Sequence, residues 1–385
     1  MHIGWSDADK AFRAELGAFL DEHAPPEASR VREGEARQGD DVIPAWARAW
    51  QATLFDNGWM VPGYPPELGG RNATPTQTLA YLEELARRHL PRSLHFPGYA
   101  IVAPSLLDFG NPAQRALAPA AIRGDEVWCI GMSEPDAGSD LAGLRTTAVR
   151  DGDRFIVSGQ KVWTSYAMAA RWCFLYTRTD PDAPKHKGIS VLLVDMRTPG
   201  IEVRPLHQIT GSAEFAEVFF TDVEVPVENL VGTENDGWRI TMGSLAHERG
   251  GLWVQSVSQV QQALDDLCDL ARRSGLDRDA GVRRELAEAY EHVASLRALG
   301  YKGFSSFARG GSAPEHSYLK LATSELGQQL NELGMRLLGP LGATTYGDAK
   351  RWTSSLFVSF ASTIGGGTSE IQRNIIATRI LGLPR

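Results

Sequence analysis

The pattern of apolar residues changes twice along this chain of 385 residues, and the two changes constrain the fold more strongly than any single motif. Segments 6–20, 43–54 and 74–88 repeat apolar residues every three or four positions, which predicts amphipathic helices. Between residues 124 and 234, short segments rich in β-branched and aromatic residues alternate with turn sequences, which predicts strands. From residue 235 the helical pattern returns and continues to the end.

This order predicts an α+β protein in three parts. We expect an N-terminal helical bundle over 1–123, a small middle β-barrel or sandwich over 124–234, and a C-terminal four-helix bundle over 235–385. Two further N-terminal helices are expected at 100–109 and 113–122. The expected strands are 127–132, 146–150, 154–157, 171–176, 188–194 and 215–225. Breaks between the C-terminal helices are expected at Gly275, Gly310-Gly311-Ser312 and Gly339-Pro340.

The charge and cysteine content exclude several classes of function. The formal net charge of −8 argues against a nucleic-acid partner. No apolar run approaches the length needed to span a membrane, and the N-terminus lacks the features of a signal peptide. Cys129, Cys173 and Cys268 are widely spaced, so we expect neither a metal site nor a disulfide framework. A cytoplasmic enzyme is the expectation that fits these features.

Two short segments of the strand-rich part carry the features of a ligand site. Met132-Ser133-Glu134-Pro135-Asp136-Ala137-Gly138-Ser139-Asp140 has the composition of a tight binding turn that follows an apolar strand. Gly159-Gln160-Lys161-Val162-Trp163-Thr164-Ser165 ends a strand with an aromatic ring and two hydroxyl groups.

These segments resemble the flavin- and thioester-binding loops of the acyl-CoA dehydrogenase family. Residues 220–232, Gly237-Trp238 and residues 365–374 are also similar to blocks of that family, so the resemblance covers nearly the whole chain. It implies FAD as cofactor and an acyl-CoA as substrate, in fatty acid or lipid catabolism such as β-oxidation. The implied reaction forms a trans-2-enoyl-CoA by loss of the α-proton to a carboxylate and of a hydride from Cβ to flavin N5. Electrons would pass to an electron-transfer flavoprotein.

The resemblance also assigns residues to the cofactor. Trp163 matches the tryptophan that packs against the isoalloxazine ring, and Ser133 and Ser165 match hydroxyls that bond its pyrimidine and N5 regions. The alternative is a core tryptophan with two surface serines. Cofactor contacts are also implied for Ile130, Met132, Thr368 and Glu370.

The substrate residues follow from the same comparison. Ser139 matches a position that contacts the CoA arm, although Ser139 and Asp140 could instead cap backbone donors of an ordinary turn. The base of medium-chain members falls at Gly366, which has no side chain but could offer its N–H to the thioester carbonyl.

Isovaleryl-CoA and long-chain acyl-CoA dehydrogenases place the base just before an arginine on another helix. Here that pair is Glu248-Arg249, so the resemblance implies that Glu248 is the α-proton base and that Arg249 contacts substrate. The alternative is that Glu248 forms an ion pair, for example with Arg249.

Two regions depart from the family pattern. Homotetrameric members bind FAD of a neighbouring subunit with an arginine-threonine-phenylalanine stretch and a glutamine before Gly-Gly. The corresponding residues here are 271–276 and 336–340, where Pro340 replaces a glycine. The chain is therefore expected to form a homo-oligomer or a heterotetramer with a related chain. A subunit with little independent activity, and an oxidase or flavin monooxygenase-like member, remain alternatives.

Overall fold

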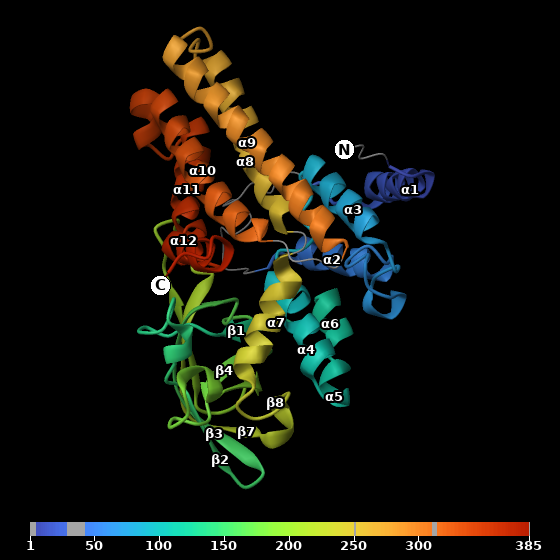
Figure 1. The fold of residues 1–385 in the computed structure, drawn as a ribbon, viewed down its shortest axis with the longest axis vertical. Coiled ribbons are helices and arrows are strands. Elements are labelled where there is room, and N and C mark those ends of the chain that lie inside the picture. Colours follow the sequence, from blue (N-terminus) through green and yellow to red (C-terminus); the bar gives the residue numbers. More distant parts are fainter. Residues whose placement is uncertain (1–4, 29–42, 250–251, 310–313, 385) are drawn as a thin grey trace.

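A computed structural model describes residues 5–28, 43–249, 252–309 and 314–384, with side chains given except at 244–249, 252 and 307. The chain forms helices, then a sheet, then helices (Figure 1), as the α+β prediction requires. Within the described part, no helix is both long enough and apolar enough to cross a membrane.

The N-terminal part contains the predicted helices, with two differences. Helices α1 (Asp7–His23) and α3 (Pro75–Arg87) each begin with a capping box, at Ser6 and Thr74, and α2 (Ala45–Asp56) lies between them in sequence. The helix expected over 100–109 begins as a π-helical turn, η3 (Gly98–Val102), and continues as α4 (Ala103–Phe109).

The helix expected over 113–122 is wrong as a single element. It is divided into α5 (Pro112–Arg115) and α6 (Ala118–Arg123). The division places Pro119 in the first turn of α6, where its missing N–H costs no helical hydrogen bond.

The middle part is one eight-stranded sheet made of two four-stranded halves. Strands β6 (Ile201–Leu206), β7 (Phe215–Pro226), β3 (Arg154–Ser165) and β2 (Thr147–Asp151) form one half. The other contains β4 (Trp172–Arg178), β5 (Ile189–Asp195) and β8 (Leu230–Val231), with β1 (Trp128–Gly131) parallel to β4. The halves join through the Thr147–Arg178 pair.

Buried side chains of both halves, such as Phe155, Leu175, Leu192 and Val218, meet in one core, as in a small sandwich. The predicted strands are present, β3 is longer than expected, and β6 and β8 were not expected.

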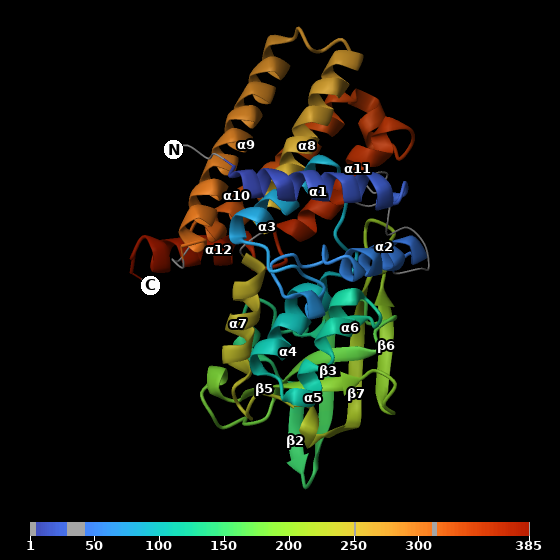
Figure 2. The same ribbon diagram turned by 90° about the vertical axis from the view of Figure 1, so that its right-hand side faces the viewer.

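The C-terminal part begins with α7 (Gly237–Arg249) and continues as α8 (Leu252–Arg273), α9 (Ala280–Phe307), α10 (Glu315–Leu337) and α11 (Asp348–Ser362). Helices α8 to α11 pack into the predicted bundle (Figure 2), whose core includes Leu264, Val293, Leu330 and Trp352. The breaks at Gly275 and Gly339-Pro340 lie between helices, and residues 310–312 lie outside the described residues. The chain ends with α12 (Ser369–Ile375) and the π-helical turn η8 (Ile376–Ile380).

Helix α7 connects the three parts. It contacts η3 and α4 of the N-terminal part and β5 of the sheet, and it leads into α8 of the bundle (Figure 2). The N-terminal helices share a hydrophobic core with β1, β4 and β5 through residues such as Leu106, Trp128 and Phe174. The loop that follows β1 and the C-terminal end of β3 therefore lie next to this shared hydrophobic core.

Candidate functional site

The two segments singled out in the sequence are held side by side. The N–H of Val162 donates to the carbonyl of Ser133 at 2.9 Å, and the Nζ of Lys161 donates to the carbonyl of Met132 at 3.1 Å. The turn that contains Met132 and Ser133 therefore lies beside the end of β3, which contains Trp163 and Ser165.

Trp163 presents its ring outward from the end of β3. Its neighbours Val162 and Thr164 are buried, whereas Trp163 is 60% exposed. The pairing of β3 with β7 shifts register between Lys161 and Thr164, and Trp163 has a φ of +59°. Positive φ is unusual for a bulky residue and is concentrated at binding sites. Its ring makes a T-shaped contact with Phe215, with the ring centroids 6.1 Å apart, and most of the side chain remains exposed.

The polar groups beside this ring are available to a ligand. Ser133 and Ser165 are partly buried, and neither side-chain hydroxyl has a hydrogen-bond partner in the described part of the chain. The Oγ1 of Thr164 is fully buried and also has none. An exposed flat ring flanked by unpaired hydroxyls fits a planar heteroaromatic group such as the isoalloxazine. Ile130 lies in β1, where its partly buried side chain packs against the N-terminal core.

A buried ion pair supports these loops, and the sequence reasoning missed it. The Nζ of Lys161 lies 2.8 Å from Glu134, with 0% and 7% of the two side chains exposed. Burial opposes ionisation of Glu134, but Lys161 and the N–H groups of Arg145 and Thr146 outweigh it, so the pKa of Glu134 is lowered. Burial lowers the pKa of Lys161, and Glu134 opposes that change. A lysine between two strand residues gave no sequence signal, because such residues are usually exposed.

The turn that contains Ser139 is exposed. Gly138 has open space around it, so no protein atom requires a glycine there. Asp140 does not cap the following 3₁₀ turn; its carboxylate instead pairs with Lys185 at 2.9 Å. The capping alternative for Asp140 is therefore wrong. A hollow of about 270 Å³, lined by residues including Glu134, Asp136 and Arg145, lies beside this turn.

A second group of predicted residues lies on the turn between α11 and α12. Gly366 and Gly367 have φ of +67° and +92°, a backbone region that glycine adopts without strain. The carbonyl of Gly366 accepts from Gln372 at 3.1 Å, and that of Gly367 accepts from the Nζ of Lys320 at 2.6 Å. Burial lowers the pKa of Lys320, and the nearby carboxylates of Glu325 and Glu370 oppose this change.

Thr368 caps α12 by accepting from the N–H of Ile371 at 3.2 Å. Glu370 is exposed in the first turn, where its own N–H and the Thr368 side chain lower its pKa. In the described part of the chain, no hydrogen bond or ion pair joins this turn to the loops of the sheet.

Glu248 and Arg249 occupy the last positions of α7, next to the start of α8. Their side chains lie outside the described residues.

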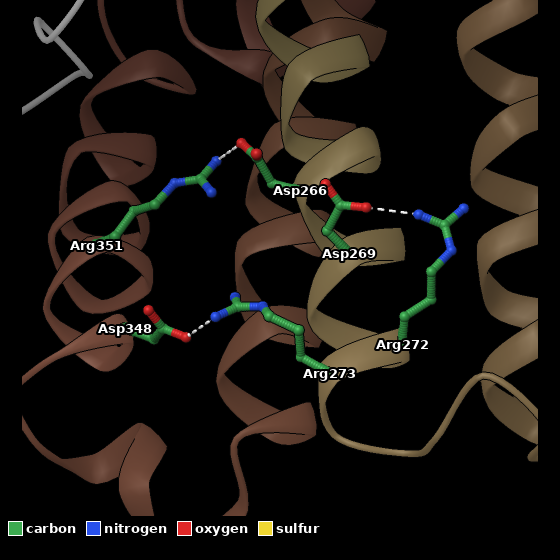
Figure 3. Close-up of a pocket in the computed structure, with 6 residues that line it drawn as sticks. All are labelled: Asp266, Asp269, Arg272, Arg273, Asp348 and Arg351. Carbon is green, nitrogen blue, oxygen red and sulfur yellow. Dashed lines mark hydrogen bonds and ion pairs between the residues drawn. The ribbon is translucent and has the colours of Figure 1, made fainter.

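The arginines aligned with the neighbour-subunit motif lie in a hollow of about 480 Å³ between α8 and α11 (Figure 3). Each arginine there has a carboxylate partner: Arg272 pairs with Asp269, Arg273 with Asp348, and Arg351 with Asp266. Arg336, at the second aligned position, pairs with Glu285 at 2.5 Å. Three arginines and three aspartates leave the hollow with no net charge.

Comparison with known proteins shows the family of this chain. Models of the acyl-CoA dehydrogenase N-terminal, middle and C-terminal domains match residues 6–125, 129–223 and 235–381. The chain belongs to the acyl-CoA dehydrogenase family. It is an oxidoreductase of the class that acts on acyl-CoA, and members of this family are flavoproteins.

Several relatives match over nearly their whole length. Acyl-CoA dehydrogenase IpdE1 of Mycobacterium tuberculosis is 39% identical over 382 residues, which cover 97% of each chain. The solved structure of a steroid ACAD, Tcur3481-Tcur3483, is 31% identical with a TM-score of 0.86, and 100% of both chains is covered. The ChsE4-ChsE5 complex from Mycobacterium tuberculosis is 32% identical with a TM-score of 0.82 and the same coverage. The ChsE4-ChsE5 structure is named as a complex of two chains. The name of the steroid ACAD likewise joins two components, Tcur3481 and Tcur3483.

Proposed function

We propose that the chain carries out FAD-dependent oxidation of an acyl-CoA to the trans-2-enoyl-CoA, with Glu248 as α-proton base. The observation that supports this most strongly is the joined pair of loops after β1 and at the end of β3. They combine an outward Trp163 ring with the hydroxyls of Ser133 and Ser165, which have no hydrogen-bond partner among the residues that the structure describes. The implied electron acceptor is an electron-transfer flavoprotein.

The chain's residues would hold the cofactor in a defined orientation. Trp163 offers one ring face, an interaction worth about 0.5–1.5 kcal/mol beyond burial. Ser133 and Ser165 donate to polar edges, and Ile130 and Met132 contribute backbone beside them. Thr368 and Glu370, at the N-terminal end of α12, would provide the remaining contacts to the cofactor. FAD held by these residues would supply the acceptor for the hydride that leaves the β-carbon of the acyl group.

The glycine turn would polarise the thioester. Lys320 and Gln372 hold the carbonyls of Gly367 and Gly366, which orients the N–H groups of Thr368 and Gly367 in the same trans peptides on the opposite side. The N–H groups of residues 366–368 have no acceptor in the described part of the chain. Donation from Gly366 to the thioester carbonyl would stabilise the negative charge that develops as the α-proton leaves.

Glu248 would accept the α-proton of the substrate. Gly366 vacates the other base position of the family, and Glu248 lies where α7 ends beside α8. Arg249 and the exposed Ser139 would contact the CoA part of the substrate.

The cofactor placement is tested with Trp163→Ala, because this change removes the stacking face and leaves buried neighbours in place. We expect FAD content after gel filtration to fall and the flavin absorption spectrum to shift. Tyr346→Ala is the matched control, since Tyr346 is 82% exposed on the C-terminal part. Equal FAD content and identical spectra in both variants would contradict the placement.

The assembly proposed for this function is a heteromer with a related chain. Arg272, Arg273 and Arg336 are already engaged by carboxylates of the same chain, so a neighbour's FAD would have to compete for them. Exposed apolar side chains gather on α11 and the C-terminal segment, which predicts an interface. They are Phe360, Ile364, Ile380, Leu381 and Leu383.

Light scattering of the chain alone and of the chain co-expressed with a related partner tests the assembly. We expect full FAD occupancy only in the mixed oligomer. A homo-oligomer of this chain with one FAD per subunit would support the homomeric alternative and contradict the heteromer.

A further inference from the structure

The end of β3 and the residue after it include two bulky side chains on left-handed backbone. Trp163 has a φ of +59° and Tyr166 a φ of +65°. Residues with a large side chain adopt this region rarely, so the surrounding contacts must hold it. Some of these contacts come from β7 and the residue before it. Ser165 pairs with Phe215 in the sheet, and the N–H of Tyr166 donates to the carbonyl of Glu214 at 3.1 Å.

Tyr166 also attaches this end of β3 to the N-terminal part. Its side chain is buried in a small hydrophobic cluster that includes Val127, the residue before β1. Its hydroxyl donates to the carbonyl of Leu94 at 2.5 Å, and its ring makes a T-shaped contact with His95, with 5.2 Å between the ring centroids. A tyrosine that packs through its ring and donates through its hydroxyl restricts the direction of the backbone that carries it.

The partner of Tyr166 is a short non-helical segment, residues 91–95, which we call the strap. The strap is itself held by α2. The hydroxyl of Ser93 donates to Gln51 at 2.5 Å and accepts from the N–H of His95 at 2.8 Å. The indole N–H of Trp50 donates to the first carbonyl of the strap at 2.8 Å. The acceptor that the strap offers to Tyr166 is therefore fixed in place before any ligand binds.

The strap contacts the bases of both flavin-type loops. The Nε2 of His95 lies 2.8 Å from the carbonyl oxygen and 3.0 Å from the amide nitrogen of Trp128, the first residue of β1. Strand β1 leads into the turn that contains Ser133, and Tyr166 directly follows Ser165. The strap therefore helps to fix the position of the loop after β1 relative to the end of β3.

We propose that Tyr166 is a positioning residue for the cofactor and acts through Trp163 and Ser165. The proposal rests on the proposed function, which places the isoalloxazine against these two residues. The bond from the Tyr166 hydroxyl to the strap keeps the Trp163 ring turned outward and the Ser165 hydroxyl beside it. A site that is ordered in advance binds more tightly, because fewer groups lose freedom on binding.

The test uses Tyr166→Phe, which removes the hydroxyl and keeps the ring that packs against His95. Tyr301→Phe is the matched control, because it also removes a tyrosine hydroxyl bond, in this case to Glu83 between α9 and α3. Amide hydrogen exchange of the FAD-free protein gives a readout that needs no cofactor. We expect residues 163–166 to exchange about 3–10-fold faster in Tyr166→Phe and at the wild-type rate in Tyr301→Phe.

FAD titration of the same proteins, with the partner chain if one is required, gives the second readout. The Kd for FAD should rise about 3–10-fold in Tyr166→Phe, and the flavin absorption spectrum should shift. Ser93→Ala tests the strap without a change at the end of β3, and it should weaken FAD binding in the same direction. The combined effect of Ser93→Ala and Tyr166→Phe should be smaller than the sum, because both changes loosen the same segment.

An unchanged FAD Kd and spectrum in Tyr166→Phe would overturn the proposal and leave the proposed function intact. A loss of FAD affinity as large in Tyr301→Phe as in Tyr166→Phe would also overturn it, because it would indicate general destabilisation. A wild type that binds no FAD, alone or with its partner chain, would instead contradict the proposed function.

Discussion

Lys161→Met is expected to destabilise the sheet at the point where the two flavin-type loops meet. Methionine keeps the length of the side chain but removes its charge, the ion pair with Glu134 at 2.8 Å and the hydrogen bond to Met132. Glu134 then stays buried with a charge that the N–H groups of Arg145 and Thr146 and the nearby Arg178 guanidinium stabilise in part. Removal of one partner of a buried ion pair costs about 3–5 kcal/mol.

The chain contains a matched control for this change. Lys185 pairs with Asp140 at 2.9 Å in the same part of the protein, but the side chains are 64% and 63% exposed. Exposed pairs contribute about 1 kcal/mol or less, so Lys185→Met should have a small effect. Double replacement with Lys161→Met and Glu134→Gln should recover part of the loss, because it removes the unpaired charge.

The assay is urea unfolding of each variant between pH 4.5 and 8. The pKa of Glu134 is lowered in the wild type, so its contribution to stability is present above the pKa of the unfolded chain and is lost as the pH falls. In Lys161→Met, burial alone raises that pKa, and protonation of Glu134 relieves the unpaired charge. The deficit of the variant should therefore shrink toward pH 4.5. A deficit below about 1 kcal/mol, or equal to that of Lys185→Met, would refute the reasoning.

The remaining predictions concern the chemistry, the glycine turn and pH. Glu248→Gln should lower the rate of flavin reduction by roughly 10²–10⁴-fold while FAD content is retained, as rapid-reaction absorbance would measure; near-wild-type reduction would exclude Glu248 as base. Gly366→Ala should lower the free energy of unfolding by about 1–2 kcal/mol, because the φ of Gly366 is +67°, which strains a residue with a Cβ. No steric clash adds to this strain, since the nearest atom to an added Cβ, on Lys320, is 4.0 Å away. An unchanged unfolding midpoint would contradict this prediction. Burial lowers the pKa of His95 to about 4, so the unfolded chain binds the proton first as the pH falls. The free energy of unfolding should therefore fall by about 3 kcal/mol between pH 6.5 and 4. His95→Gln should flatten this part of the plot of unfolding free energy against pH.

The sequence predicted the elements whose side chains follow a simple period. Helix α3 shows both the amphipathic spacing and the Thr74 cap, and the structure contains it within one residue of the expected bounds. Strands β4 and β5 are almost wholly buried apolar runs, and both were found. Strand β6 was not predicted, because its side chains are exposed or only partly buried and because it contains charged residues and a proline.

The candidate site residues could be proposed from the sequence only through resemblance to a family. Trp163, Ser133 and Ser165 were identified by resemblance, but the exposure of Trp163 depends on a register shift that no periodicity encodes. Lys161 could not be assigned to the interior, because its partner Glu134 lies on a different segment and only the fold brings them together. The ion pair of Arg273 could not be predicted for the same reason, since its partner Asp348 is 75 residues away in sequence.

Anaerobic mixing of the FAD-loaded protein, with its partner chain if one co-purifies, with a panel of acyl-CoAs tests the central claim most directly. The flavin absorbance should bleach with at least one acyl-CoA, the matching trans-2-enoyl-CoA should form, and an artificial electron acceptor should restore the oxidised spectrum. Glu248→Gln should bleach at least about 100-fold more slowly with the same substrate. Absence of bleaching across plain, branched and oxygenated acyl-CoAs would contradict the account, as would stoichiometric peroxide formation in air, which would indicate an oxidase.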